Sequence, residues 1–481
     1  MASTLDIKSY PGNIINNQIK PTEKTRHAID PATEEPLPEV PVSTKEDLDT
    51  AVQYAREAFK TWSKTTFDER AKLVLKFADA IEANREELQK LDVMESGKPI
   101  ALATQEFDMS LAWLRKFSTM EIKDEIIEEN DERIIYSTFP PIGVCAAIIP
   151  WNWPGLLCVG KVGPALLTGN TIIAKPSPFT PYVDLKLGEL GASIFPPGVF
   201  QVLSGDDSLG PWITEHPGID MVAFTGSTHT GKLVAASCAK TLKRCLLELG
   251  GNDAAIILED VDIPKCLPKI TTLAFLNSGQ ICMDIKRIYV HEKIYDEFRD
   301  AMVEFTKQAI KTGGGFEPGV IVGPVQNNMQ YGIVKGLYED VKKNGYKVAL
   351  EGKILETTKG YLAEPTIVDN PPDNSRIVLE EPFGPIVPLL KWSSEEEVIG
   401  RANSLRVGLG ASVWGKDLRR AEKIARQLSA GSVWVNSHFD VAPNVPFGGH
   451  KDSGLGMAWG VEGFKQFTNT TSLWVWKKVF E

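Results

Sequence analysis

Cysteine is scarce in this chain, with six residues in 481. No two cysteines form a Cys-x-x-Cys pair, and no group of cysteine and histidine has the spacing of zinc ligands, so we expect no bound metal. Disulfide bonds would add little to a chain of this size with so few cysteines. We therefore expect free thiols in a reducing compartment, and a cytoplasmic location.

Long apolar runs and excess positive charge are also missing. No stretch reaches the roughly 18 apolar residues that a membrane-spanning helix needs, so we expect no membrane partner. The segment Met1–Tyr10 mixes charged and polar residues, which argues against a signal peptide. The formal net charge of -11 repels phosphate backbones and so argues against a nucleic-acid partner. A small anionic cofactor remains compatible with this charge, because backbone N–H groups can bind one.

The composition itself is that of a folded globular protein. Hydrophobic residues make up 43% of the chain and charged residues 24%, which is enough to build a sizeable core. The chain is longer than one ordinary domain of about 100–200 residues. We therefore expect two or three domains.

Helical patterns dominate the first part of the chain. Thr44 followed by Asp47 predicts a helix start, and apolar residues recur at helical spacing from there to Phe59. Further helices are expected near 71–83 and 110–117. Between 121 and 139, charged residues alternate with Ile and Tyr, which fits either a protruding two-stranded arm or an ordinary surface hairpin.

From residue 142, short apolar strands alternate with helices. Strands are expected near 144–149, 171–175, 200–204 and 221–225, and again near 254–258, 288–290, 321–322 and 412–414. This alternation predicts two successive α/β domains, each with a parallel sheet covered by helices on both faces. Ligands of such sheets bind beyond the carboxyl ends of the strands.

A glycine-rich segment, Phe-Thr-Gly-Ser-Thr-His-Thr-Gly-Lys, covers residues 224–232 between an expected strand and an expected helix. Gly226 and Gly231 would let the backbone approach a pyrophosphate at the helix N-terminus. A P-loop needs Ser or Thr after its lysine, but Leu233 stands there, which argues against nucleotide hydrolysis. An ordinary tight turn is the alternative.

Two residues have the chemistry of a nucleophile and a base. Cys282 follows a Ser-Gly turn after an apolar helix, where backbone N–H groups could stabilise a thiolate; the other five cysteines fit the role of small buried hydrophobes. Glu248 lies between leucines and a Gly pair, and burial would raise its pKa toward that of a general base. The alternative for Glu248 is an exposed glutamate on a strand.

Two polar residues end expected strands. Asn152, in Pro-Trp-Asn-Trp-Pro at 150–154, could donate its amide to an oxyanion, or could simply close a turn. Lys175, which precedes Pro176, could bind a ribose or phosphate, or could be a solvated strand end.

Together these segments resemble the aldehyde dehydrogenase superfamily over nearly the whole chain. The matching motifs occur in the family's order: Pro-Trp-Asn-Trp-Pro, Ala-Lys-Pro-Ser, Phe-Thr-Gly-Ser-Thr, Glu-Leu-Gly-Gly-Asn, Gly-Gln-Ile-Cys, Glu380-Glu-Pro-Phe383-Gly-Pro and Pro446-Phe-Gly-Gly449. Chance agreement of seven ordered motifs is negligible. The resemblance implies oxidation of a small-molecule aldehyde to a carboxylic acid with NAD or NADP.

The resemblance also implies roles for particular residues. Cys282 would attack the aldehyde carbon, Asn152 and the Cys282 backbone N–H would hold the oxyanion, and Glu248 would activate water to hydrolyse the resulting thioester. Six residues would bind the cofactor: Lys175 and Glu381 at the two riboses, Phe383 beside the nicotinamide, Gly226 and Ser227 at the pyrophosphate, and Trp151.

The fold implied by the resemblance is α/β, with a Rossmann-type cofactor domain, a second α/β catalytic domain and a β-arm for oligomerisation. The cofactor domain would comprise 1–120 and 142–250, and the catalytic domain 251–440. The arm would comprise 121–141 and 462–481, pairing near Leu473-Trp-Val-Trp-Lys. Family members are usually dimers or tetramers, so a homodimer or homotetramer is expected.

The chain departs from the family pattern at two places. Many NAD-preferring members have a glutamate three residues after the strand-end lysine, but Pro178 stands there, so the choice between NAD and NADP is open. Small residues usually follow the nucleophile, but Met283-Asp-Ile-Lys286 follows here. Asp284 would raise the pKa of the nucleophile if it pointed inward; we expect it to point away and pair with a cation.

The positions that correspond to the family's substrate tunnel are all apolar: Met109, Trp113, Trp153, Leu276, Met283, Val441 and Phe447. They favour a medium-sized apolar or aromatic aldehyde over a semialdehyde that carries a carboxylate. Two other classes of function remain as alternatives: non-redox acyl transfer or thioester hydrolysis by Cys282, and a non-catalytic protein on the same fold. Release of an acyl phosphate is disfavoured because Glu248 is available as a base for water.

Overall fold

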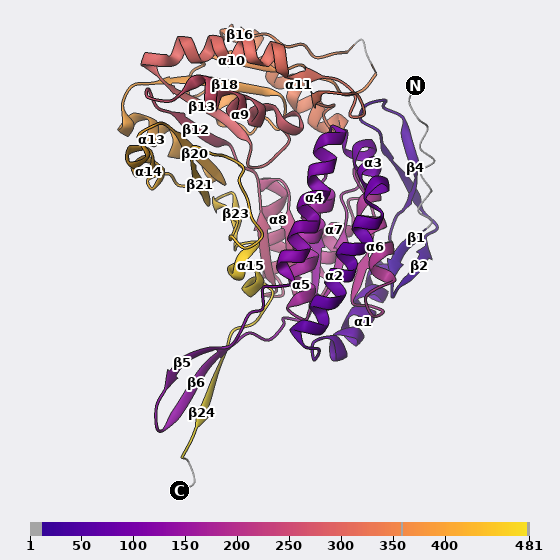
Figure 1. Cartoon of the computed structure of the whole chain (residues 1–481). Coiled ribbons are helices and arrows are strands. Elements are labelled where there is room, and N and C mark those ends of the chain that lie inside the picture. The colour runs from indigo at the N-terminus through magenta and orange to yellow at the C-terminus, as the bar shows by residue number, and fades with distance from the viewer. Residues whose placement is uncertain (1–11, 357–358, 479–481) are drawn as a thin grey trace.

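The computed structural model describes residues 12–356 and 359–478. These residues form two α/β units, each built on its own sheet, and a narrow arm that projects from the first unit (Figure 1). The segment Met1–Tyr10, for which no signal peptide was expected, lies outside the described residues. Within the described residues, no helix has both the length and the apolar character needed to cross a membrane.

The first unit contains an eight-stranded sheet. Its five central strands are parallel, and the edge strands are antiparallel. In spatial order the strands are β2 (Gln18–Pro21), β1 (Gly12–Ile15), β9 (Phe200–Val202), β8 (Thr171–Lys175), β7 (Val144–Ile148), β10 (Met221–Thr225), β11 (Arg244–Glu248) and β23 (Gly454–Leu455). The expected domain boundaries assigned no place to β23, which returns from the C-terminal part of the chain to pair with β11.

Helices cover both faces of this sheet. Side chains alternate along β7, so that Cys145 and Ala147 pack against one set of helices and Val144 and Ala146 against the other. The first set is α2 (Phe67–Ala83), α3 (Arg85–Ser96), α4 (Ile100–Phe117), α5 (Pro154–Leu167) and α6 (Tyr182–Ala192). The second set is α1 (Lys45–Trp62), α7 (Leu209–Glu215) and α8 (Thr228–Ala239). The sequence-based expectation for the start of α1 is confirmed, because Thr44 and Asp47 form a reciprocal capping box.

The second unit is built in the same way. Its sheet runs β16 (Val348–Leu350), β17 (Thr366–Asp369), β18 (Ile386–Trp392), β13 (Ile285–His291), β12 (Asp253–Ile257), β20 (Gly410–Trp414) and β21 (Ser432–Val435), with only the pairing of β16 antiparallel. One face carries α9 (Ile263–Phe275) and α10 (Tyr295–Ala309). The other carries α11 (Asn328–Lys343), α12 (Arg376–Leu379), α13 (Glu395–Asn403) and α14 (Leu418–Ala425). The α/β fold class is therefore confirmed.

One expected strand of the second sheet lies elsewhere. The segment near 321–322 forms β15 (Val320–Val322), but β15 pairs with the short β14 (Lys311–Thr312) and not with the seven-stranded sheet. A three-residue strand with a buried apolar pattern does not encode which sheet it joins. The sheet that this strand joins depends on where the preceding helix α10 ends in the folded chain.

The arm is three-stranded. The hairpin of β5 (Glu125–Glu129) and β6 (Arg133–Thr138) pairs through β6 with β24 (Thr471–Trp476), as Figure 1 shows below the first unit. The expected pairing with the segment near Leu473 is therefore present, with Leu473 opposite Tyr136. All of β24 is exposed.

Candidate active site

A large cavity opens at the carboxyl ends of the first sheet, where the fold predicts a ligand. Its volume is about 980 Å³, near the upper end for small-molecule sites and large enough for a dinucleotide. The cavity brings together eight residues that the sequence singled out: Trp151, Asn152, Lys175, Gly226, Ser227, Cys282, Glu381 and Phe383. Five of them come from the first unit, and Cys282, Glu381 and Phe383 come from segments of the second part of the chain.

The N-terminus of α8 forms one wall of this cavity. Ser227 caps the helix by accepting a hydrogen bond from the backbone N–H of Thr230 at 3.2 Å, and Gly226, Ser227 and Thr230 all line the cavity. The first N–H groups of a helix have no partner within it and favour an anion. Lys232 pairs with Asp452 at 2.9 Å, in contrast to a P-loop lysine, which would reach a bound phosphate. This wall therefore fits a pyrophosphate without P-loop chemistry.

Lys175 lies at the end of β8, almost fully buried. Burial lowers the pKa of Lys175 to about 8, and the charge of Asp207 opposes this shift. Asp207 and Pro178 line the same cavity. The sequence analysis did not single out Asp207, although it follows β9, at the strand ends where ligands of parallel sheets bind.

Cys282 follows a strained turn. Positive φ angles of 50°, 60° and 71° occur at Asn277, Ser278 and Gly279. These residues belong to the short 3-10 helix Leu276–Gly279 that follows α9. A Cβ on Gly279 would lie 2.4 Å from the carbonyl oxygen of Gly384, so only glycine fits there. Non-glycine residues in this region are unfavourable unless surrounding contacts hold them, and such strain occurs most often at functional sites.

Two hydrogen bonds hold Asn152 beside this turn. The Asn152 side-chain amide donates to the carbonyl oxygen of Gln280 at 3.0 Å, and the Asn277 amide donates to the Asn152 carbonyl oxygen at 3.3 Å. A primary amide has two N–H donors, so one donor of Asn152 remains for a ligand. Asn152 is thus oriented by Asn277 in the turn and by Gln280 directly after it.

The thiol of Cys282 is half-buried at the cavity wall. Burial raises the pKa of Cys282 to about 12, Lys286 lowers it, and the carboxylates of Glu381 and Glu248 raise it. The thiol is therefore the resting form at neutral pH. All six cysteines are free, as expected, and Cys145, Cys158 and Cys238 are buried.

Glu248 ends β11 and is buried, which excludes the exposed alternative. Its Oε2 atom accepts from the Thr225 hydroxyl at 3.1 Å and lies 3.5 Å from the ammonium of Lys161. Lys161 also donates to Thr225 at 2.6 Å. Oε1 has no hydrogen-bond partner among the described residues. The sequence analysis missed Lys161 and Thr225, because neither lies near Glu248 in the chain.

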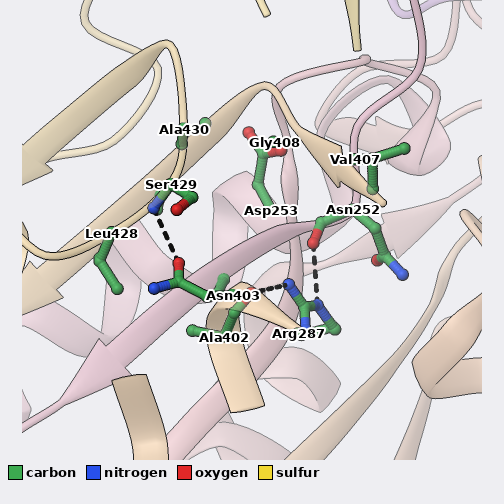
Figure 2. A pocket seen from close by; sticks show the side chains of 13 residues that line it. Asn252, Asp253, Arg287, Ala402, Asn403, Val407, Gly408, Leu428, Ser429 and Ala430 are labelled. Carbon is green, nitrogen blue, oxygen red and sulfur yellow. Dashed lines mark hydrogen bonds between the residues drawn. The ribbon is translucent and has the colours of Figure 1, made fainter. Parts of the chain in front are cut away.

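The Gly-Gly-Asn segment after Glu248 is tied to the loop that carries Glu381. The Gly251 N–H donates to Glu381 at 3.2 Å, and the Asn252 amide donates to the carbonyl oxygen of Val378 at 3.0 Å. Figure 2 shows the next contact, in which Arg287 donates from Nε to the Asn252 carbonyl oxygen at 2.8 Å. These bonds fix the position of Glu381 relative to β11 and β13.

Asp284 does not form the expected pair with a cation. Its side chain is fully buried, and neither carboxylate oxygen has a hydrogen-bond partner among the described residues. Burial raises the pKa of Asp284 well above its ordinary value, and the nearby charge of Lys286 opposes this shift. The sequence around Asp284 suggests an exposed loop after Cys282, but tertiary packing covers Asp284 completely.

The seven residues expected to contact substrate belong to, or pack against, the large apolar core cluster of the first unit, against which Cys282 also packs. None of them lines the large cavity. Two aromatic residues that the sequence analysis missed join them: Trp459 packs edge-on against Trp113 and stacks on Phe447, and Phe439 packs on Trp153. The seven are Met109, Trp113, Trp153, Leu276, Met283, Val441 and Phe447.

A buried charged group lies beneath this cluster. The ammonium of Lys98 lies 4.9 Å from the centre of the Trp153 ring and pairs with Glu106 and, at 3.1 Å, with Asp92. Glu106 also accepts from the Leu156 N–H at 3.0 Å, at the start of α5. This group contacts the segment that follows Asn152, at Trp153 and Leu156.

Comparison with known proteins agrees with this geometry. The model of the aldehyde dehydrogenase family matches residues 19–473. Aldehyde dehydrogenase LUC3 of Fusarium sp is 40% identical over 97% of this chain and 98% of its own. Human aldehyde dehydrogenase 1A1 is 39% identical over 93% of this chain and 91% of its own.

A solved structure has the same fold. The NAD+ complex of aldehyde dehydrogenase from Bacillus cereus superposes with a TM-score of 0.94 at 37% identity, covering 98% of this chain and 97% of that one. Oxidation of an aldehyde with NAD(P) is therefore the activity of this chain, which belongs to the aldehyde dehydrogenase family.

Proposed function

We propose that Cys282, Asn152 and Glu248 carry out the oxidation, with the cofactor bound in the large cavity. The observation that supports this most strongly is the cavity wall itself, which places Cys282 and Asn152 beside the six expected cofactor residues. A dinucleotide would lie with its pyrophosphate at the N-terminus of α8 and its riboses at Lys175 and Glu381.

The thiol of Cys282 gives up its proton to solvent water, and the resulting thiolate attacks the aldehyde carbon, forming a carbon–sulfur bond and an alkoxide. The free N–H of Asn152 and the backbone N–H of Cys282 donate to that alkoxide, stabilising charge that develops in the transition state. When bound, the nicotinamide supplies the acceptor for the hydride that leaves the same carbon. The product on the chain is a thioester at Cys282.

Glu248 then releases the acid. Its unpartnered Oε1 takes a proton from water as the water oxygen attacks the thioester carbonyl, and Cys282 leaves as a thiolate. Thr225 and Lys161 hold the other carboxylate oxygen, which orients the side chain. A base of this kind favours hydrolysis over transfer of the acyl group to another acceptor.

The apolar character of the seven expected substrate residues supports a medium-sized apolar or aromatic aldehyde as substrate. Purified protein is assayed with NAD by the near-ultraviolet absorbance of the reduced cofactor, using hexanal, benzaldehyde and succinate semialdehyde. We expect higher kcat/KM for the first two, because no cation that could pair with a substrate carboxylate lies among the seven residues. Strong turnover of succinate semialdehyde alone would contradict the substrate class, whereas no turnover of any aldehyde would count against the roles in the active site.

Asp207 supports a preference for NAD over NADP. Its carboxylate shares the cavity with Lys175, the expected ribose residue, and would repel a 2′-phosphate. Two unit charges about 4 Å apart repel by on the order of 1 kcal/mol in water, so we expect Asp207→Asn to raise the NADP-to-NAD ratio of binding constants about fivefold or more. Fluorescence titration with NADPH and NADH measures this ratio. Asp206→Asn is the matched control, because Asp206 pairs with Lys24 instead; an equal change in both variants would argue against a specific role for Asp207.

The arm supports assembly into a homodimer or homotetramer. Its strand β24 exposes Leu473, Trp474, Val475 and Trp476, a continuous apolar stretch of the kind that marks a protein–protein interface. Light scattering should therefore give two or four times the mass of one chain. Replacing Trp474 and Trp476 with serine should lower that mass, and a wild-type protein that is monomeric at assay concentrations would rule the proposal out.

A cytoplasmic location is consistent with the six free cysteines, because thiols stay reduced there. Microscopy of a fluorescent fusion tests this location. Signal confined to a membrane-bound compartment would overturn it.

A further inference from the structure

Lys286 lies at the meeting point of the nucleophile and the expected cofactor residues. Its ammonium donates to the carbonyl oxygen of Cys282 at 2.5 Å and pairs with Glu381 at 2.9 Å. The same ammonium lies 5.6 Å from the centre of the Phe383 ring. One side chain thus contacts three residues of the proposed site, although it does not itself line the cavity.

The lysine is almost fully buried, at 2% exposure, and must therefore be balanced by nearby charge. Burial works against its charged form, but the carboxylates of Glu381 and Asp253 outweigh that effect and raise the pKa of Lys286 above its ordinary value. It is cationic at neutral pH. The titratable groups that face Lys286 from the surrounding elements are Asp253, Cys282, Asp284, Glu381 and His438, and Glu248 faces Cys282.

These facing groups are mostly acidic, which makes Lys286 important for the thiolate. Glu248, Asp253 and Glu381 each disfavour a negative charge on Cys282, and Lys286 is the cation that opposes them. A cation within about 4–6 Å typically lowers the pKa of an acidic group by about 1–3 units. Without Lys286, the thiolate would form beside uncompensated carboxylates.

We propose that Lys286 is a positioning residue that links the nucleophile to the cofactor site: it holds Glu381 for the ribose, fixes the backbone of Cys282 and favours the thiolate. The proposal rests on the proposed roles of Cys282 and Glu381. The Lys286 side chain is a structural link between β13 and the loop that carries Glu381.

The decisive measurement is alkylation of Cys282 by iodoacetamide at several pH values, followed by mass spectrometry of the Cys282 peptide. Below the pKa of a thiol, its alkylation rate rises tenfold per pH unit, because the thiolate is the nucleophile. Lys286→Gln keeps an N–H donor for the Cys282 carbonyl but removes the charge. We expect its alkylation rate to fall about tenfold or more at every pH, the effect of about one unit of pKa.

Three comparisons make this result specific. Lys286→Arg, which keeps the charge, should restore most of the alkylation rate. Lys307→Met, an exposed lysine paired with Glu304 on α10, should change nothing. The Cys245 peptide in each sample is an internal reference, because its thiol lies on β11 and its rate should be equal in all variants.

Binding of the cofactor supplies a second readout. Release of Glu381 from Lys286 should weaken NAD+ binding several-fold in Lys286→Gln, as measured by calorimetry. A folded Lys286→Gln with unchanged Cys282 alkylation and unchanged NAD+ affinity would overturn the proposal. If Lys286→Gln does not fold, Glu381→Gln tests the same contact from the other side, and we expect weaker NAD+ binding in that variant. Failure of the proposed function is a separate outcome, because it would appear as aldehyde oxidation that survives Cys282→Ala.

Discussion

Replacing Cys282 with alanine is expected to lower kcat for aldehyde oxidation by on the order of 10⁴-fold or more, because no other group can form the thioester. The change removes one sulfur atom from a half-buried position, and the turn before it is held by backbone and side-chain contacts that do not involve the thiol. We therefore expect the variant to fold and to bind NAD+ with nearly unchanged affinity. The rate of cofactor reduction at a saturating aldehyde concentration measures the loss of kcat.

The matched control for this change is Cys266→Ala. Burial raises the pKa of Cys266 to about 11, close to that of Cys282, but Cys266 lies on α9 and donates to the carbonyl oxygen of Ile263. It should keep normal kcat. Aldehyde oxidation that persists in Cys282→Ala at a rate similar to the wild type would refute the thioester mechanism. The activity would then depend on the cofactor site without a covalent intermediate at Cys282.

Replacing Glu248 with glutamine is expected to separate the two halves of the reaction. The steady-state rate should fall by about 10²–10⁴-fold, the usual contribution of a general base. Thioester formation does not need this base, so the first turnover should still give a rapid burst of reduced cofactor. Glutamine is nearly the same shape and can still accept from Thr225, so the fold should be preserved. Stopped-flow absorbance resolves the burst from the slow phase.

Added hydroxylamine distinguishes this mechanism from a general loss of activity. Hydroxylamine is a strong neutral nucleophile that attacks a thioester without a base, so it should restore turnover in Glu248→Gln and produce a hydroxamic acid. Glu189→Gln is the matched control on the surface of α6 and should behave as the wild type. A burst that slows in parallel with the steady-state rate would show that Glu248 acts before the thioester forms.

Local patterns in the sequence were sufficient for the central elements of the fold. The capping pair of Thr44 and Asp47 marks the start of α1, and the short apolar runs of β7, β8 and β10 lie where the alternation predicted. The start of α4 was predicted ten residues late, near Ser110, whereas the helix begins at Ile100. The buried stripe of this helix includes the polar residues Glu106 and Ser110, which interrupt the apolar period in the sequence.

In the candidate site, too, some residues could be identified from local sequence and others could not. The identities of Cys282, Glu248 and Asn152 follow from short motifs, because each motif combines a reactive side chain with the glycine or proline turn that presents it. Their partners lie far away in the chain. Lys161 reaches Glu248 from α5, Asp207 reaches the cavity from the end of β9, and Trp459 joins the apolar cluster from the C-terminal segment.

The sequence by itself determined the family, the α/β class, the candidate nucleophile and base, and the glycine-rich turn at the helix start. Only the tertiary structure decided the burial of Asp284, the contacts of Lys286 with Cys282 and Glu381, and the return of β23 to the first sheet. The physical reason is that turns and helix caps are set by neighbours within a few residues. Burial and ion pairing depend on which distant segments the two sheets bring together, and that arrangement is a property of the whole chain.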